Sequence, residues 1–145
     1  MKEQSIVIIE DNLIDAELAI KALQKGGAKG EIQVLKDGAA ALEFFFGMGR
    51  FKNRQTNILP SLVLLDLMIP KVSGFEVLEL MRANKHTMYI PVVVFSSSSV
   101  DADIQKAYKL GANAFLVKPM DFKSYSDLMK SVSQFWINCN KTSYR

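Results

Sequence analysis

Acidic side chains follow two of the most apolar segments of this 145-residue sequence. Glu10 and Asp11 end the segment SIVIIED at 5–11, and Asp66 ends the segment SLVLLD at 61–66. A lone ionised carboxylate in such apolar surroundings is costly to bury. Asp66 must therefore lie at the open end of a buried strand, or a nearby cation must offset its charge.

A hydroxyl and an ammonium end two further apolar segments. PVVVFS at 91–96 ends in Ser96, and NAFLVK at 113–118 ends in Lys118. Crowded carboxylates repel one another unless a cation lies between them, and an all-oxygen site with open positions suits Mg²⁺. A metal-bound carboxylate beside a lysine and a hydroxyl can attack phosphorus, because the cations neutralise charge on the transferring group. Side chains of these types indicate phosphoryl transfer, with Asp66 as the acceptor.

The segments that carry these side chains have the pattern of parallel strands. Short apolar runs at 5–10, 31–36, 61–66, 91–96 and 113–118 alternate with segments of helical periodicity. Strands that alternate with helices indicate parallel crossovers, and nearly continuous apolar runs are typical of strands covered on both faces. The sequence therefore predicts an α/β fold, a doubly wound five-stranded parallel sheet with helices on both faces. Ligands of such a sheet bind at the carboxyl ends of its strands, where the candidate side chains lie.

Cap and turn residues bound the predicted helices. Asn12 can cap a helix that runs to about Lys25, where two glycines follow. The other helices are expected to start near Gly38, Gly74, Ser99 and Asp121. The last of them carries apolar and aromatic residues at helical spacing, a pattern more typical of a core face than of a cofactor site. These residues are Phe122, Tyr125, Leu128, Met129, Val132, Phe135 and Trp136.

Length and composition favour a single globular domain. The net charge of +3 arises from 18 basic and 15 acidic residues scattered along the chain, without the basic patch of a nucleic-acid-binding protein. No apolar run is long enough to span a membrane, and the N-terminus lacks the order of a signal peptide, so a cytoplasmic protein is expected. With one cysteine, Cys139, and one histidine, His86, any metal would be held by oxygen.

One long connection lies at 47–60, GMGRFKNRQTNILP. It exceeds the usual length of a link between a helix and a strand. A partner-binding insertion and a solvated surface loop both fit this segment, and the surface loop is the simpler interpretation.

Four motifs occur in chain order: IVIIEDN, DLMIPKVSG, VVVFSSSS and AFLVKP. Together they resemble the motifs of response-regulator receiver domains of two-component signalling. The resemblance covers about residues 4–136, which are expected to form the receiver domain, followed by a C-terminal tail at 137–145 and no separate output domain. It implies a flavodoxin-like sheet of strand order 2-1-3-4-5.

The resemblance implies a Mg²⁺ site around the phosphoacceptor. Asp66 would accept the phosphoryl group and, together with Asp11, would bind the metal directly. Glu10 would act through a water molecule, and the backbone carbonyl of Met68 would complete the protein ligands.

The resemblance also implies how the phosphoryl group would be held. Ser96 and Lys118 would each bind one of its oxygens. The peptide bond before Pro119 is expected to be cis, which would aim Lys118 inward. Pro70 and Gly74 match the structural positions of the acceptor motif.

A switch is expected to follow phosphorylation. Ser96 would move toward the phosphoryl group, and Phe115 would turn into the vacated space and alter the surface of the fourth helix, fifth strand and fifth helix. Phe115 lacks the hydroxyl that many relatives carry as tyrosine, so a switch step that needs this hydroxyl is not expected here. A buried Phe115 without a signalling role is the alternative.

The segments EDNLIDAELAIKAL and DADIQKAYKLGANAFLVKPMD most resemble stand-alone regulators partnered with phytochrome-type histidine kinases. The resemblance implies a sensor histidine kinase as donor, a downstream protein target, and a homodimer through the face between the fourth and fifth helices. Neither nucleic acid nor membrane is an expected partner. The protein would be a stoichiometric phosphoacceptor and not an enzyme. The alternative is a degenerate receiver that binds partners without phosphorylation, which the presence of every required side chain disfavours.

Overall fold

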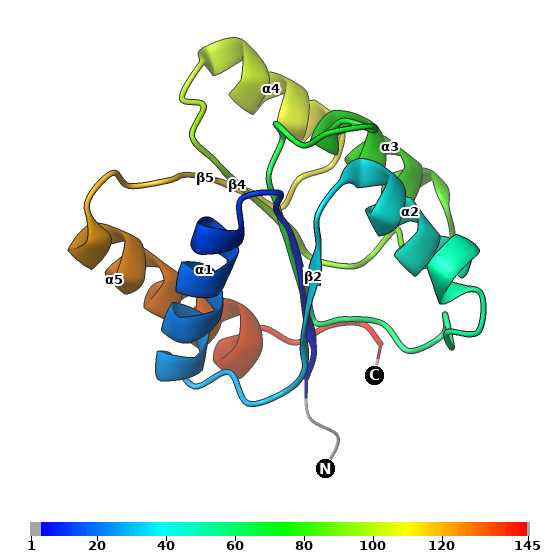
Figure 1. Ribbon diagram of the computed structural model, residues 1–145, viewed down its shortest axis with the longest axis horizontal. Helices are drawn as coiled ribbons and strands as arrows, with labels where there is room; N and C mark the ends of the chain where they lie inside the picture. The colour runs from blue at the N-terminus through cyan, green and yellow to red at the C-terminus, as the bar shows by residue number, and fades with distance from the viewer. Residues whose placement is uncertain (1–3, 145) are drawn as a thin grey trace.

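Residues 4–144 are described by a computed structural model, and they form a parallel sheet covered by helices on both faces (Figure 1). The strands are β1 (Ile6–Ile9), β2 (Ile32–Leu35), β3 (Leu62–Leu65), β4 (Val92–Ser96) and β5 (Ala114–Val117). The helices are α1 (Leu13–Lys25), α2 (Gly38–Phe46), α3 (Gly74–Ala83), α4 (Asp101–Lys109) and α5 (Phe122–Val132). A 3₁₀ turn, η1 (Gly49–Phe51), follows α2, and a π-helical segment, η2 (Ser133–Cys139), follows α5.

The order of the strands is β2-β1-β3-β4-β5, which confirms the predicted order and fold class. β1, β3 and β4 are buried along their whole length, as their continuous apolar runs predict. β2 and β5 lie at the two edges and are only partly buried. In register, Ile9 lies opposite Leu35 on one side and Leu65 on the other. The carboxyl ends of β1 and β3 are therefore adjacent.

Alternate side chains of the strands enter two separate apolar layers. Ile6 and Ile8 of β1 pack with α1 and α5, whereas Val7 and Ile9 pack with α2 and α3. Figure 1 shows these helix pairs on opposite faces of the sheet. Because successive side chains of a strand point to opposite faces, a run such as IVII supplies both layers at once.

The helices begin at cap residues. The Asn12 side chain accepts hydrogen bonds from the backbone N–H groups of Ile14 and Asp15 at 3.0 and 3.1 Å, as predicted for this position. Asp37 and Ser73 cap α2 and α3 in the same way. α4 starts at Asp101, two residues later than expected, and no side chain caps it.

The end of the chain is more ordered than a tail. Among the apolar and aromatic residues at helical spacing in the last helix, Tyr125, Met129 and Val132 are buried against α1, which confirms their predicted core role. Phe122 and Phe135 are instead 65% and 54% exposed. Beyond residue 136, η2 continues to Cys139. The Tyr144 hydroxyl then donates to the Pro60 carbonyl at 2.6 Å. Folded structure thus extends past the expected boundary of 4–136.

Arg54 makes polar and aromatic contacts that hold the connection at 47–60. The Arg54 guanidinium donates to the carbonyls of Phe44 and Ile58, both at 2.8 Å, and lies 3.8 Å from the centroid of the Phe44 ring. Arg54 therefore ties the connection to α2. Among residues 4–144, no helix has the length and apolar character needed to cross a membrane.

Arg82 joins α3 to the connection before β4 and to the connection before β5. Its Nε donates to the Gly111 carbonyl at 2.9 Å, and Nη1 donates to the carbonyls of Met88 and Ile90 at 3.0 and 2.9 Å. Nη2 donates to Oδ1 of Asn113 at 2.9 Å. Arginine suits this place because its planar fork carries five donors.

We predict that Arg82→Met lowers the free energy of unfolding by about 2–3 kcal/mol, since several carbonyls lose a charged donor. Urea denaturation measures this, with Arg50→Met as the matched control at a side chain that is 71% exposed. Equal losses for the two variants would show that the Arg82 contacts contribute nothing particular.

Candidate functional site

The adjacent ends of β1 and β3 bring three carboxylates together. Oxygens of Glu10, Asp11 and Asp66 all lie within 4.8 Å of one another. The Asp66 N–H donates to the Ile9 carbonyl at 3.0 Å, which extends the strand pairing as far as the acid itself. Glu10 and Asp66 are buried and Asp11 is exposed. The cluster thus has two buried members and one at its mouth.

Lys118, after β5, supplies the positive charge of the cluster. Its Nζ donates to Oε1 of Glu10 and, at 3.1 Å, to Oδ2 of Asp66. It also lies 3.3 Å from Oδ2 of Asp15 on α1. The Asp15 contact was not predicted, although its signal was available: Asp15 lies in the first turn of the helix capped by Asn12, directly after the acidic end of the first strand.

Burial and charge act in opposite directions on these groups. Burial raises the pKa of Glu10 to about 7, the Lys118 hydrogen bond opposes that rise, and the charge of Asp66 adds to it. For Lys118, burial alone would lower the pKa. The hydrogen bond with Glu10 and the charge of Asp66 outweigh burial and leave the Lys118 pKa raised.

The Asp66 carboxylate is held at both oxygens. The Met68 N–H donates to Oδ1 at 3.0 Å while Lys118 binds Oδ2, so the orientation of the carboxylate is set. Met68 is 69% exposed, so its side chain does not cover the backbone next to Asp66. Behind the site, a Cβ on Gly74 would lie 2.6 Å from the Asp66 carbonyl oxygen, so only glycine allows α3 to start so close to the acid. Pro70 accepts a hydrogen bond from the Gly38 N–H at 3.1 Å, which ties the acceptor loop to α2.

Ser96 and Phe115 lie on the neighbouring strands. Ser96 is fully buried at the end of β4, and its carbonyl accepts from the Lys118 N–H at 2.8 Å. This bond fixes the end of β5 beside that of β4. Phe115 is partly buried and packs against Leu67, Val94 and Ala107. The expected switch residues are therefore near the site and near α4.

The expected cis peptide bond before Pro119 is wrong: the peptide bonds of residues 4–144 are all trans. The trans form is the more stable one even before proline. Lys118 needs no cis bond here, because its long side chain reaches Glu10 and Asp66 from the trans backbone.

The donor set fits a hard divalent cation. Three carboxylates supply only oxygen ligands, and the exposed position of Asp11 leaves room for water or substrate oxygens. Such an ion could be held by Asp11, Asp66 and Glu10. Lys118 could balance the negative charge of a substrate group bound beside the ion. The arrangement combines a nucleophilic carboxylate with cations around it, which suits attack on phosphorus.

Comparisons with known proteins show which family the sequence matches. The family described as response regulator receiver domain matches residues 6–131. A probable methanogenesis regulatory protein, FilR2 of Methanothrix harundinacea, is 35% identical over 94% of this chain and 86% of its own. Response regulator Rcp1 of Synechocystis is 33% identical over 91% of this chain and 88% of its own.

Solved structures extend the similarity to nearly the whole chain. The phosphorylated cyanobacterial phytochrome response regulator RcpA superposes with a TM-score of 0.91 at 30% identity, covering 98% of this chain and 99% of its own. The Mn²⁺-bound form of Rcp1 superposes with a TM-score of 0.89 at 31% identity, covering 96% and 98%.

The raised pKa of Glu10 predicts how metal-free stability depends on pH. A group whose folded-state pKa of about 7 exceeds its unfolded value of about 4.3 stabilises the fold below the lower value and loses this effect as pH rises through 7. We predict that the difference in unfolding free energy between the protein and Glu10→Gln falls from pH 5 to 7, by up to about 1.4 kcal/mol per unit.

Urea denaturation in EDTA at several pH values measures this difference. Glu79→Gln, at an exposed position of α3, is the matched control and should show no such slope. A flat difference for Glu10→Gln across this range would contradict the effect of burial on Glu10.

Proposed function

Because the chain belongs to the response regulator receiver domain family, we propose that it accepts a phosphoryl group from a sensor histidine kinase onto Asp66. The observation that carries the proposal is the buried Asp66 carboxylate, held between Lys118 Nζ and the Met68 N–H beside two more carboxylates. A positioned nucleophile with compensating charge beside it supports phosphoryl transfer, which depends on positioning and electrostatic stabilisation.

Mg²⁺ is the proposed cofactor, and when bound it neutralises charge on the oxygens of the transferring group. Asp11 and Asp66 would hold it directly, with the Met68 carbonyl as a further ligand and Glu10 acting through water. Glu10 would then depend less on Lys118, because part of the acidic charge would be compensated at the metal site, and Lys118 would be available to a phosphoryl oxygen.

In the transfer step, a carboxylate oxygen of Asp66 attacks the phosphorus of a phosphohistidine. The new O–P bond forms as the P–N bond breaks, and the imidazole nitrogen leaves with the electron pair and takes up a proton. Lys118 Nζ, already 3.1 Å from Oδ2 of Asp66, would pair with one phosphoryl oxygen. The Ser96 hydroxyl would donate to another.

The output would be a change of surface. Movement of Ser96 toward the phosphoryl group would leave space for Phe115, which packs against Ala107 of α4. A shift of Phe115 would therefore move α4, and a downstream protein target would recognise the altered surface. A purely structural Phe115 remains the competing interpretation.

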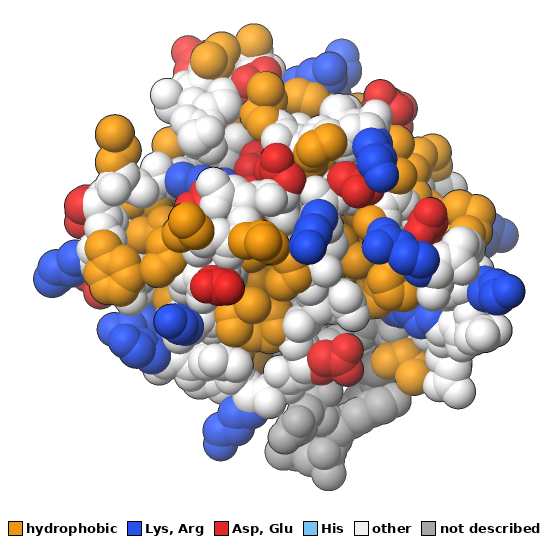
Figure 2. Space-filling model, in the orientation of Figure 1, with side chains coloured by type: hydrophobic (Ala, Val, Ile, Leu, Met, Phe, Trp, Pro, Cys, Tyr) orange, Lys and Arg blue, Asp and Glu red, His pale blue; other side chains and the backbone are white. Residues whose placement is uncertain are grey.

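Exposed apolar side chains around the mouth of the site suit a protein donor. Leu13 and Ile14, at the start of α1, are 54% and 71% exposed, and Met120 and Phe122, before and within α5, are 104% and 65% exposed. Figure 2 shows hydrophobic side chains over α1 and α5, at the left of the view. Patches of this kind mark protein interaction sites.

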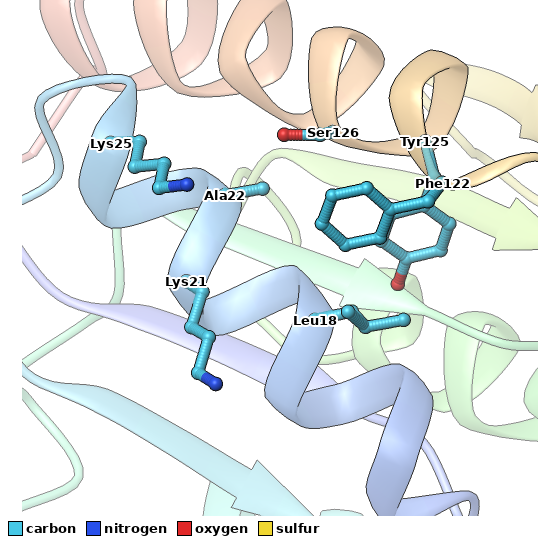
Figure 3. A pocket seen from close by; sticks show the side chains of 7 residues that line it. All are labelled: Leu18, Lys21, Ala22, Lys25, Phe122, Tyr125 and Ser126. Atoms are coloured by element: carbon cyan, nitrogen blue, oxygen red, sulfur yellow. The ribbon is translucent and has the colours of Figure 1, made fainter.

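A shallow cavity of about 110 Å³ continues this patch between α1 and α5 (Figure 3). Phe122 and Leu18 lie at one end of it, and Lys21 and Lys25 extend from α1 at its rim. A donor that presents apolar side chains flanked by acidic ones would fit this surface. The similarity to RcpA, a phytochrome response regulator, supports a phytochrome-type kinase as that donor.

Phosphorylation is tested with Mg²⁺ and acetyl phosphate by intact mass spectrometry. We predict a mass gain of one phosphoryl group for the unaltered protein, and none for Asp66→Asn or in EDTA. Asp127→Asn, at an exposed acid of α5, is the matched control and should be labelled normally. Failure of both acetyl phosphate and a histidine kinase to label Asp66 would favour a module that binds partners without phosphorylation.

Self-association through the face of α4 and α5 is part of the proposal. Val100 and Val117 on this face are 59% and 40% exposed, and Phe135 beyond α5 is 54% exposed, whereas Trp136 is partly buried. We predict concentration-dependent dimers that are weakened by Val117→Glu and not by Leu80→Glu on α3. Sedimentation velocity with and without a phosphoryl mimic decides this. A monomer at every accessible concentration, with and without the mimic, would contradict it.

A further inference from the structure

α4 is the least buried of the helices that flank the sheet. Ala107 is its one buried residue within the described chain, and Val100 at its start provides no side-chain cap. In Figure 1, α4 stands at one end of the molecule, beyond the two helix pairs that cover the sheet. Little apolar burial therefore fixes its position, and individual polar contacts carry more weight than in the other helices.

Besides the packing of Ala107, three polar or cation–π side-chain contacts hold α4 among residues 4–144. At its first turn, the Ser98 hydroxyl donates to Oδ2 of Asp103 at 2.7 Å. Near its end, Lys106 Nζ lies 4.4 Å from the centroid of the Phe75 ring of α3. The third contact joins α4 to the sheet: the Phe115 N–H donates to the Tyr108 hydroxyl at 3.1 Å.

The bond from Phe115 to Tyr108 occupies a free edge of the sheet. β5 pairs with β4 alone, so backbone groups on its other side have no strand partner among residues 4–144. At one residue, the Tyr108 hydroxyl accepts the hydrogen bond that a neighbouring strand would otherwise accept. That residue is Phe115, which lies at the switch position and has no hydroxyl of its own.

We propose that Tyr108 is a positioning residue that pins α4 to β5 at Phe115 and so stabilises the resting arrangement of the switch. Tyr108 is 49% exposed, and among residues 4–144 its hydroxyl is the sole polar side-chain link from α4 to the middle of β5. Displacement of α4 would break this bond. The inference rests on the proposed function, because the displacement is driven by phosphorylation of Asp66.

The test compares Tyr108→Phe with the unaltered protein. Tyr108→Phe removes one hydroxyl from a half-exposed ring and leaves the ring to pack. Amide hydrogen exchange followed by NMR reports the hydrogen bond between Phe115 and Tyr108 directly. We expect the Phe115 amide to exchange about fivefold faster in Tyr108→Phe, the factor that one ordinary hydrogen bond gives. Tyr89→Phe, at an exposed tyrosine before β4, is the matched control and should leave Phe115 unchanged.

Titration with beryllium trifluoride and Mg²⁺ reports the coupling to the switch. We expect Tyr108→Phe to bind this phosphoryl mimic up to about fivefold more tightly, because the resting arrangement has lost one stabilising bond. An unchanged exchange rate at Phe115 would show that Tyr108 does not hold α4 to β5. Faster exchange with unchanged affinity for the mimic would overturn its coupling to the switch.

Failure of the unaltered protein to bind the mimic is a different result from either of these. It would overturn the proposed function and, with it, the coupling of Tyr108 to phosphorylation. The exchange rates at Phe115 would still decide whether Tyr108 pins α4.

Discussion

The structure depends on one lysine that compensates the charge of buried carboxylates. Lys118 Nζ contacts Glu10, Asp15 and Asp66, and its side chain is only 11% exposed. Without a cation, two buried acids at adjacent strand ends would repel each other and lose their hydration. The cost of holding these acids in place is therefore offset locally, by the same charge that the proposed function assigns to the phosphoryl group.

The parallel topology makes this arrangement possible. β1, β3, β4 and β5 each end at one edge of the sheet, so residues from four distant parts of the chain meet there without a specialised loop. Glycine at 74 lets α3 start against the Asp66 carbonyl, and the bond between Lys118 N–H and the Ser96 carbonyl aligns the last two strands. Burial of the strands thus fixes the chemistry at their ends.

Sequence patterns anticipated the features that follow from burial and capping. Continuous apolar runs identified the central strands, and Asn12 correctly marked the start of α1. Three features were not anticipated: the contact of Asp15 with Lys118, the trans bond before Pro119, and the hydrogen bond from Tyr144 to the Pro60 carbonyl. Each depends on where distant segments meet in three dimensions, which local periodicity does not specify. The bond from Phe115 to Tyr108 belongs to the same class, because it requires knowing which strand edge remains open.

The unfolding free energy of Lys118→Met at pH 8 tests whether Lys118 offsets the buried acids and whether a divalent cation can share this role. We expect the free energy of unfolding to fall by about 3 kcal/mol in EDTA, because the buried acids lose the partner of their ion pair. We expect Mg²⁺ to restore part of this loss. Lys123→Met, at a lysine side chain that is 88% exposed, should lose little in either condition. A Lys118→Met protein as stable as the unaltered one in EDTA would show that Lys118 does not offset the charge of the buried acids.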